Sequence, residues 1–372
     1  MINFYNIGKQ NIKFEKNFFK KIKEINNSGR YILSKNASEF EKKFSRITQS
    51  KYCVAVGNCL DAIRLTFEAY KILEILKEND EVIVPANTYI ATILGISQSK
   101  LKPVLIDPEP LTYNISLDGI KKAVTKKTKA ILAVDLYGQP ADLINIKRFA
   151  KKNKLLLLED AAQAHGALIN NKPIGSISDA TFFSFFPGKI LGAFGDAGAI
   201  TTQNKKLRDV LVSIRNYGEE YYHQLNKRKY KNRYIGFNSR LDELQAAALN
   251  LKLKTFFQEK KKRISIAKFY LKNIRNNKIK LPVINKNYSH AWHLFVVTCV
   301  KRNKLKNFLH KRGIQTMIHY PIPPHKQFAY KSLNKLNLPI TENLSKTVLS
   351  LPMNTTLDLK DLKHIVKNIN IF

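Results

Sequence analysis

The stretch Leu155-Leu156-Leu157-Leu158-Glu159-Asp160 decides the fold class of this chain. Four consecutive leucines with no polar residue between them indicate a strand that is buried on both faces, as the strands of parallel sheets are. The run ends in two carboxylates, and ligands of open α/β sheets bind beyond the carboxyl ends of the strands. We therefore expect Asp160 to lie at the edge of a sheet where a site can form.

Six more strand-like segments accompany this one between about residue 51 and residue 204. They alternate with helix-like segments such as 61–70, and this alternation predicts an α/β fold with a seven-stranded, mostly parallel sheet flanked by helices. The six segments are 52–56, 81–85, 103–107, 130–134, 181–186 and 199–202.

The rest of the chain predicts a smaller C-terminal α/β domain. Residues 241–262 have helical periodicity, with Asn238 or Ser239 expected as the N-cap. A strand over 292–300, a helix over 304–312 and a helix after Leu357 follow. We predict a large domain over 1–240, whose first 35 residues form an N-terminal arm, and a small domain over 241–372. A polar, tyrosine-rich surface loop over 215–233 precedes the small domain.

The composition indicates a folded protein without a membrane segment. The chain has 372 residues, of which 44% are hydrophobic, enough for a large core. It has no apolar stretch that could span a bilayer and no signal-peptide pattern at its start. The three cysteines, Cys53, Cys59 and Cys299, have no metal-ligand spacing. We expect a protein of the reducing cytoplasm that holds no metal.

The net charge of +36 comes from 64 Lys and Arg against 28 Asp and Glu. Such a charge is found in nucleic-acid-binding proteins. Here the basic residues are mostly lysines, are spread along the whole chain and accompany no nucleic-acid motif, so we expect no specific nucleic-acid partner. The positive field favours anionic substrates such as nucleotide diphosphates.

Lys189 is the basic residue that carries chemistry. It follows the apolar run 181–186, precedes a Gly-rich turn, and comes twenty-nine positions after Asp160. A lysine amine and a strand-end carboxylate are what a pyridoxal 5'-phosphate enzyme requires: the amine forms the Schiff base and the anion keeps the pyridine nitrogen protonated. A strand-end carboxylate can also be a simple helix N-cap. Gln163, three residues after Asp160, could reach the same ligand and favours a binding role.

Three further features suit the same cofactor. The Ser184 hydroxyl can donate to a phosphate. The turn 57–61 joins a strand to a helix, whose first amides bind phosphate in many proteins. Tyr89 can stack on a planar ring, although a partly buried aromatic at a strand end is common without one. In the segment 319–325, a rigid proline loop, two histidines lack nearby carboxylate or cysteine ligands, so a substrate contact is favoured over a metal.

These stretches together resemble the DegT/DnrJ/StrS-type sugar aminotransferases, which have the type I fold of pyridoxal phosphate enzymes. The similarity runs from residue 28 to residue 352. The stretches that carry it are Pro85-Ala86-Asn87-Thr88-Tyr89-Ile90-Ala91-Thr92, Leu136-Tyr137-Gly138-Gln139-Pro140, Glu159-Asp160-Ala161-Ala162-Gln163-Ala164-His165-Gly166, the Lys189 segment and Asn238-Ser239-Arg240-Leu241. The segment 318–325 is similar to enzymes that aminate C-3 of dTDP-3-keto-6-deoxyhexoses.

The resemblance implies a role for each matching residue. Lys189 is expected to form the Schiff base, Asp160 to pair with the pyridine nitrogen, Gln163 to contact the ring hydroxyl and Tyr89 to stack on the ring. Ser184 and the amides near Leu60 and Asp61 are expected to hold the phosphate, together with Asn238 of a second subunit in an obligatory homodimer. Substrate contacts are expected from Tyr31, His165, Tyr217, Tyr222, Arg240, His319 and Tyr320.

Two positions depart from the family pattern. Many relatives have Ser or Thr where this chain has Leu60-Asp61, so backbone amides must do more of the phosphate binding. Ser34 stands where many relatives have Gly, in the N-terminal substrate loop.

The expected reaction is a transamination through pyridoxamine phosphate. L-Glutamate gives its amino group to C-3 of a dTDP-3-keto-6-deoxyhexose, and the product is a dTDP-3-amino-3,6-dideoxyhexose for surface glycans. Two alternatives remain open at this point. One is the same chemistry at C-4 of a UDP- or dTDP-linked keto sugar, or on a cyclitol. The other is a catalytically silent relative that only binds cofactor or nucleotide sugar.

Overall fold

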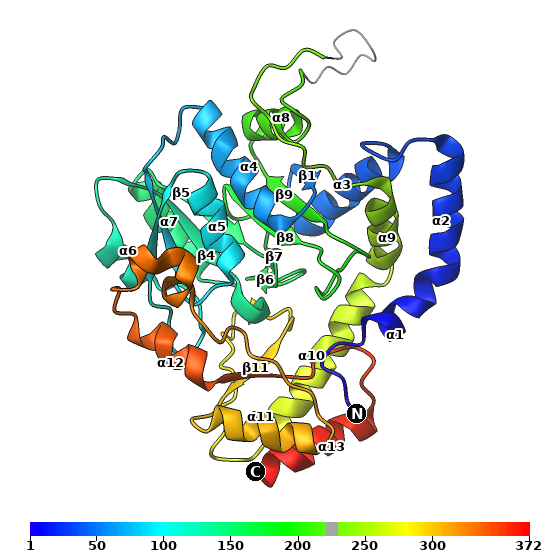
Figure 1. Cartoon of the computed structure of the whole chain (residues 1–372), viewed down its shortest axis with the longest axis vertical. Coiled ribbons are helices and arrows are strands. Elements are labelled where there is room, and N and C mark those ends of the chain that lie inside the picture. Colours follow the sequence, from blue (N-terminus) through cyan, green and yellow to red (C-terminus); the bar gives the residue numbers. More distant parts are fainter. Residues whose placement is uncertain (221–229) are drawn as a thin grey trace.

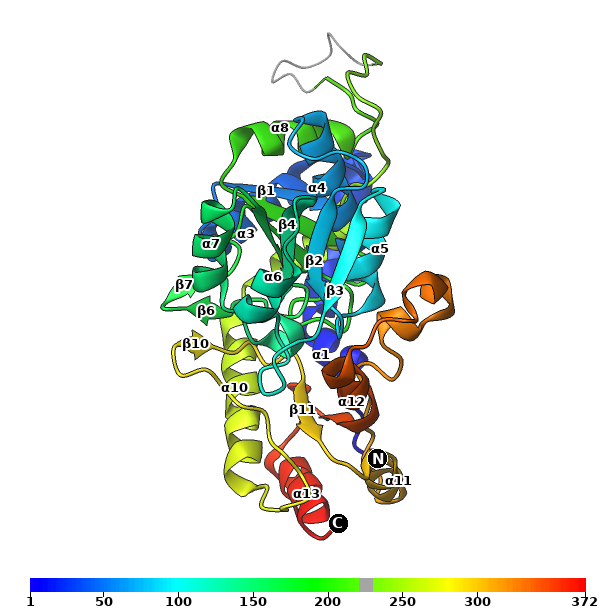
Figure 2. The same cartoon turned by 90° about the vertical axis from the view of Figure 1, so that its left-hand side faces the viewer.

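The computed structural model describes residues 1–220 and 230–372. Its centre is a seven-stranded sheet in the order β1-β9-β8-β5-β4-β2-β3 (Figures 1 and 2). Each of the seven predicted strands is confirmed. Their bounds are β1 Tyr52–Val56, β2 Glu81–Pro85, β3 Lys102–Ile106, β4 Thr128–Val134, β5 Leu156–Asp160, β8 Ala180–Ser184 and β9 Gly198–Thr202.

The sheet is mostly parallel, as predicted. Strands β3, β2, β4, β5 and β8 pair in parallel, whereas β9 is antiparallel to both β8 and β1. The leucine run of β5 is buried on both faces: Leu157 and Leu158 are fully buried in different hydrophobic clusters. The carboxyl ends of the parallel strands therefore meet at one edge, where Asp160 ends β5.

Helices cover both faces of this sheet (Figure 2). One face packs against α4 (Cys59–Ile72), α5 (Ile90–Gln98) and α8 (Lys205–Ile214). The other packs against α3 (Lys35–Thr48) and α9 (Glu243–Leu253) near β8 and β9, and against α6 (Leu117–Ala123) and α7 (Leu143–Lys152) near β2 and β4. The short helix α1 (Ile7–Asn11) and the longer helix α2 (Glu15–Ser28) precede α3.

The C-terminal part has its own hydrophobic cluster. It is built on α10 (Phe256–Asn273), α11 (Arg302–Lys311), α13 (Leu359–Asn370) and an antiparallel pair of strands, β11 (Phe295–Thr298) and β12 (Val348–Leu351). The remaining elements are α12 (Pro339–Thr347) and a small sheet of β6 (Leu168–Ile169), β7 (Lys172–Pro173) and β10 (Tyr288–Ser289). Figure 1 shows this part below the central sheet.

Two local predictions in this region are wrong. The helix expected over 241–262 is divided into α9 and α10 at Thr255. Helical periodicity continues through the break because α9 buries its apolar side chains against α3, and α10 buries its own partly in the C-terminal cluster. The N-cap of α9 is Asp242, which accepts a hydrogen bond from the Gln245 amide, and not Asn238 or Ser239.

The described residues contain no helix that is both long and apolar enough to cross a membrane. Tyr222, an expected substrate contact, lies outside the described residues.

Candidate active site

A cavity of about 320 Å³ opens at the carboxyl edge of the sheet. Its walls come from the ends of β4, β5 and β8, the first turn of α4 and the segment before α5. The 319–320 segment of the C-terminal part closes another side. Lys189, Asp160, Gln163, Ser184, Tyr89, Leu60, His319 and Tyr320 all line it. The cavity thus brings together eight of the residues that the sequence singles out.

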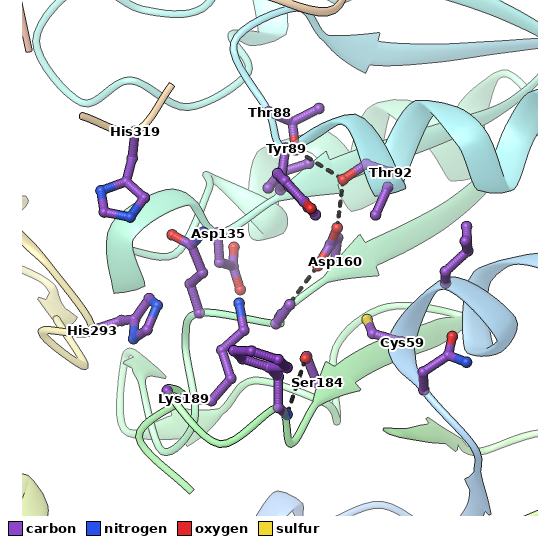
Figure 3. A pocket seen from close by; sticks show the side chains of 18 of the residues that line it. Cys59, Thr88, Tyr89, Thr92, Asp135, Asp160, Ser184, Lys189, His293 and His319 are labelled. Carbon is purple, nitrogen blue, oxygen red and sulfur yellow. Dashed lines mark hydrogen bonds between the residues drawn. The ribbon is translucent and has the colours of Figure 1, made fainter. Parts of the chain in front are cut away.

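Asp160 is a buried carboxylate with two donors of its own. Thr92 Oγ1 donates to Asp160 Oδ2 over 2.7 Å, and the Ala162 amide donates to Oδ1 over 3.1 Å (Figure 3). The Thr88 hydroxyl lies 2.8 Å from the Thr92 hydroxyl, so the side chains of Thr88, Thr92 and Asp160 are linked by hydrogen bonds. Burial raises the pKa of Asp160, while these donors and Lys189 oppose the rise. The carboxylate is therefore held in one orientation with its charge available to a cation in the cavity.

Lys189 lies in the turn that follows β8, where its amide donates to the Phe186 carbonyl over 2.8 Å. Figure 3 shows its side chain extending into the cavity. Burial lowers the pKa of the Lys189 amine, and the nearby Cys59 and Asp160 only partly offset this effect. A lysine with a lowered pKa is more often present as the free amine, which is the nucleophilic form.

The opposite end of the cavity is the first turn of α4. Asn58 is its N-cap, and the Asn58 side chain accepts the Asp61 amide over 2.8 Å. This occupies one of the two amides expected to bind phosphate, and the Asp61 carboxylate instead accepts from Ser239 and Arg64. Within the described part of the chain the amides of Cys59 and Leu60 have no acceptor, because the first amides of a helix have no intrahelical acceptor. Ser184 faces the same cavity.

Rings and an amide form the wall between the two parts of the chain. Gln163 accepts from the Tyr137 amide over 2.7 Å and donates to the Tyr320 hydroxyl over 2.9 Å. The Tyr320 ring lies 5.2 Å from that of Tyr89, which is 53% exposed. His319 Nδ1 lies 2.8 Å from Ser350 Oγ, and burial lowers the pKa of this imidazole to about 4. The wall is therefore neutral, with several hydroxyl and imidazole groups.

Beside Asp160 lies a second, fully buried carboxyl pair, Asp135 and Glu159. Asp135 Oδ1 accepts from the Ala141 amide, and Glu159 Oε2 accepts from Thr181. The other oxygen of each is buried and has no donor among the described residues. Burial and the neighbouring Glu159 raise the pKa of Asp135 well above its ordinary value. A proton on Asp135, donated to Glu159, accounts for both unpaired oxygens.

His165 is not brought to the cavity. It is fully buried and packs between Phe183 and Phe185, at 5.6 and 5.4 Å between ring centroids. Burial lowers the pKa of its imidazole to about 3. The structure therefore does not place His165 among the residues that line the cavity, and a substrate contact by His165 stays a prediction.

None of the residues Tyr31, Tyr217, Asn238 and Arg240 lines the cavity of its own chain. Arg240 donates to Asn216 over 2.7 Å and lies 5.1 Å from the Tyr217 ring. The backbone of Asn238 forms an antiparallel bridge with that of Asn216, and the Tyr31 carbonyl accepts a hydrogen bond from the Glu243 amide. Tyr31 and Tyr217 are both about half exposed. No side chain of this group takes part in the cavity described above.

Several residues that line the cavity are not among those expected from the sequence: Tyr5, Thr88, Thr92, Asp135, Phe186 and His293. Thr88 and Thr92 stand four positions apart within a stretch already recognised, and this spacing could have indicated that they act together. Tyr5 and His293 carry no local signal, because only the tertiary fold brings them to the sheet edge. The described residues contain no cluster of His, Cys, Asp and Glu that could hold a metal ion.

The groups in the cavity suit pyridoxal phosphate. They supply a buried amine, a buried carboxylate for a pyridinium, free helix amides with a serine hydroxyl for a phosphate, and an exposed tyrosine face.

Comparisons with known proteins agree with this geometry. The family model described as the DegT/DnrJ/EryC1/StrS aminotransferase family matches residues 13–370. A protein of Aneurinibacillus thermoaerophilus named dTDP-3-amino-3,6-dideoxy-alpha-D-galactopyranose transaminase is 44% identical over 370 residues, covering 100% of this chain and 99% of that protein. A Pseudomonas aeruginosa protein named UDP-2-acetamido-2-deoxy-3-oxo-D-glucuronate aminotransferase is 34% identical and covers 98% of both chains.

The fold is also similar to that of a solved structure. The crystal structure of S. venezuelae DesV in complex with a ketimine intermediate has a TM-score of 0.94 and 34% identity, covering 100% of this chain and 98% of that one. The residues of the cavity, the family model and these relatives lead to one conclusion. This chain belongs to the DegT/DnrJ/EryC1/StrS aminotransferase family and is a pyridoxal-phosphate-dependent aminotransferase.

Proposed function

We propose that this enzyme moves the amino group of L-glutamate to C-3 of a dTDP-3-keto-6-deoxyhexose. The product is a dTDP-3-amino-3,6-dideoxyhexose, a building block for surface glycans such as lipooligosaccharide. The observation that carries the proposal is the Lys189 amine placed opposite the buried Asp160 in one cavity. Support for C-3 comes from the relative named for a dTDP-3-amino sugar, which is 44% identical over its whole length.

Several cavity residues have a role in this reaction. The bound cofactor supplies an electron sink and carries the amino group between the two substrates. Asp160, oriented by Thr92, holds the protonated ring nitrogen, and Gln163 contacts the ring hydroxyl. Ser184 and the Cys59 and Leu60 amides hold the phosphate.

The Lys189 amine is the base. It removes the proton from the α-carbon of glutamate and, with the second substrate, delivers a proton to C-3 of the sugar. Its lowered pKa keeps a larger fraction of the amine unprotonated and able to accept that proton.

The proposed active enzyme is a homodimer with shared sites. Tyr31, Tyr217, Asn238 and Arg240 form one polar, partly exposed group that its own cavity does not use. We assign this group to the cavity of a second copy, where Asn238 reaches the cofactor phosphate and the others contact substrate. Tyr222 belongs to the same proposal, although it lies outside the described residues.

A second candidate substrate is a UDP-linked 3-keto sugar. The relative named for a UDP-linked 3-oxo sugar covers 98% of this chain, at 34% identity. In both substrates the ketone is at C-3, so the two candidates differ mainly in the nucleotide and in the substituents of the ring.

The test is a direct assay with L-glutamate and four substrates: dTDP- and UDP-linked hexoses, each as the 3-keto and the 4-keto form. We expect the fastest turnover with the dTDP-linked 3-keto sugar. Lys189→Ala should abolish turnover, whereas Lys151→Ala, a change at an exposed lysine, should leave it unchanged. Turnover by the Lys189→Ala protein would refute the mechanism, and a preference for a 4-keto sugar would refute the assigned position.

A further inference from the structure

Tyr5 lies in the cavity although it stands far from every motif in the sequence. It lines the same wall as Phe186, Gly188 and Lys189. A Cβ atom at Gly188 would lie 3.6 Å from both Cζ and Cε1 of Tyr5, so the phenol ring packs directly against the residue before Lys189. The Tyr5 ring and the Lys189 side chain therefore line one cavity.

The backbone of this N-terminal segment is held firmly by the C-terminal part of the chain. The Ile2 amide donates to the Gly313 carbonyl over 2.6 Å, and Gln315 Oε1 accepts the Phe4 amide over 3.2 Å. Asn354 Nδ2 donates to the Asn3 and Phe4 carbonyls over 3.0 and 3.2 Å. Both views show the N-terminus beside this part of the chain (Figures 1 and 2). These hydrogen bonds hold the backbone next to Tyr5 in one place relative to the cavity.

Packing also fixes the direction of the Tyr5 ring. The buried Phe4 ring meets it edge to face, with 4.7 Å between centroids, and Phe4 also lies 5.9 Å from the His319 ring. Tyr5 and His319 therefore flank one residue and face the same cavity. Burial raises the pKa of Tyr5, which keeps the phenol protonated and able to donate. Among the described residues none hydrogen-bonds the Tyr5 hydroxyl.

The surroundings of Tyr5 indicate what it binds. Among the described residues that line the cavity, Lys189 is the only Lys or Arg. Arg263 also acts electrostatically on Tyr5, but it does not line the cavity, and its guanidinium donates to the carbonyls of Trp292, His293 and Met353. Carboxylates such as glutamate are bound by cations and amides. A ring that carries several hydroxyl groups is bound by neutral donors and acceptors with apolar faces between them.

We propose that Tyr5 is a substrate-binding residue of the sugar half-reaction, whose hydroxyl hydrogen-bonds a ring hydroxyl next to the keto carbon. This inference rests on the proposed function, because it takes the second substrate to be a keto sugar. It adds a residue from the start of the chain to the substrate contacts His319 and Tyr320 of the same cavity.

The test is Tyr5→Phe, which removes the hydroxyl and keeps the ring. The two half-reactions are measured separately on the holoenzyme, by the absorbance change of the cofactor. We expect kcat/KM for the keto sugar to fall about tenfold, the effect of one net hydrogen bond, and kcat/KM for glutamate to stay the same. The dissociation constant of the aminated nucleotide sugar, measured by titration calorimetry, should rise by the same factor.

Tyr52→Phe is the matched control. Tyr52 is also half-buried but lies at the start of β1 beside Arg208, outside the cavity, and its loss of a hydroxyl should change neither half-reaction. An unchanged sugar half-reaction in Tyr5→Phe, or an equal loss in both half-reactions, would overturn the inference while leaving the proposed function intact. A wild-type enzyme that converts glutamate but aminates no keto sugar would overturn the proposed function, and this inference with it.

Discussion

Replacing Asp135 with asparagine should change how the stability of the protein depends on pH. Asp135 and Glu159 are fully buried, and each has one oxygen without a donor among the described residues. Burial raises the pKa of both carboxyls, that of Asp135 well above its ordinary value, while Thr181 helps to stabilise the charge on Glu159. The folded pair therefore keeps one proton on Asp135 at pH values where both carboxyls of the unfolded chain have lost theirs.

The size of the effect follows from that single proton. Unfolded Asp and Glu titrate near pH 4, so above about pH 5 the folded state binds one proton more than the unfolded state. The free energy of unfolding then falls by about 1.4 kcal/mol for each pH unit, until the pH reaches the raised pKa of the pair. Asparagine can donate the same hydrogen bond to Glu159 without titrating. For each pH unit between about pH 5 and the raised pKa of the pair, the Asp135→Asn protein should gain about 1.4 kcal/mol relative to the wild type.

The measurement is urea unfolding of both proteins at several pH values, with equal cofactor content in every sample. Contributions from Lys189 and the histidines occur in both proteins and cancel in the difference. Asp118→Asn, a change at an exposed carboxyl that pairs with Lys121, controls for the loss of a surface charge. Stability curves of wild type and Asp135→Asn that run parallel across this pH range would show that the pair shares no proton. The wild-type infrared spectrum should also contain a band of a protonated carboxyl that the Asp135→Asn protein lacks.

Two further substitutions test the supports of the site. Thr92→Val removes the 2.7 Å hydrogen bond to Asp160. Because a hydrogen bond to a charged group contributes about 1.5 kcal/mol or more, the affinity for the cofactor should fall roughly tenfold in a fluorescence titration. Equal affinities of the two proteins would mean that Thr92 does not support the carboxylate. Glu243→Ala should lower the free energy of unfolding by about 3 kcal/mol, since the buried Glu243 carboxylate accepts the amides of Ser34, Asn36 and Ala37 over 2.7 to 3.0 Å. Glu243→Gln, which keeps one acceptor oxygen, should lose less, and a similar loss in both variants would contradict this account.

The central sheet could be predicted because its signals are local. Each strand is a short apolar run, and four adjacent leucines predict that β5 is buried on both faces of the sheet. The break between α9 and α10 could not be predicted, because both helices bury apolar residues with the same period and only their different packing partners separate them. The prediction of the α9 N-cap is wrong for a similar reason. Ser239 is a suitable cap residue, but its hydroxyl donates a hydrogen bond to Asp61.

The sequence by itself determined the reactive pair and its setting. Asp160 ends one strand and Lys189 follows another, the chain order of the strands implies a shared edge, and the stretches around them identify the family. Only the tertiary structure decided what surrounds the pair. Thr92, Tyr5 and His293 reach the cavity through long-range packing, His165 is removed from it, and Asp135 meets Glu159 only because β4 and β5 are neighbours. Local residue order encodes secondary structure, whereas burial and the proton content of a site depend on residues that are distant along the chain.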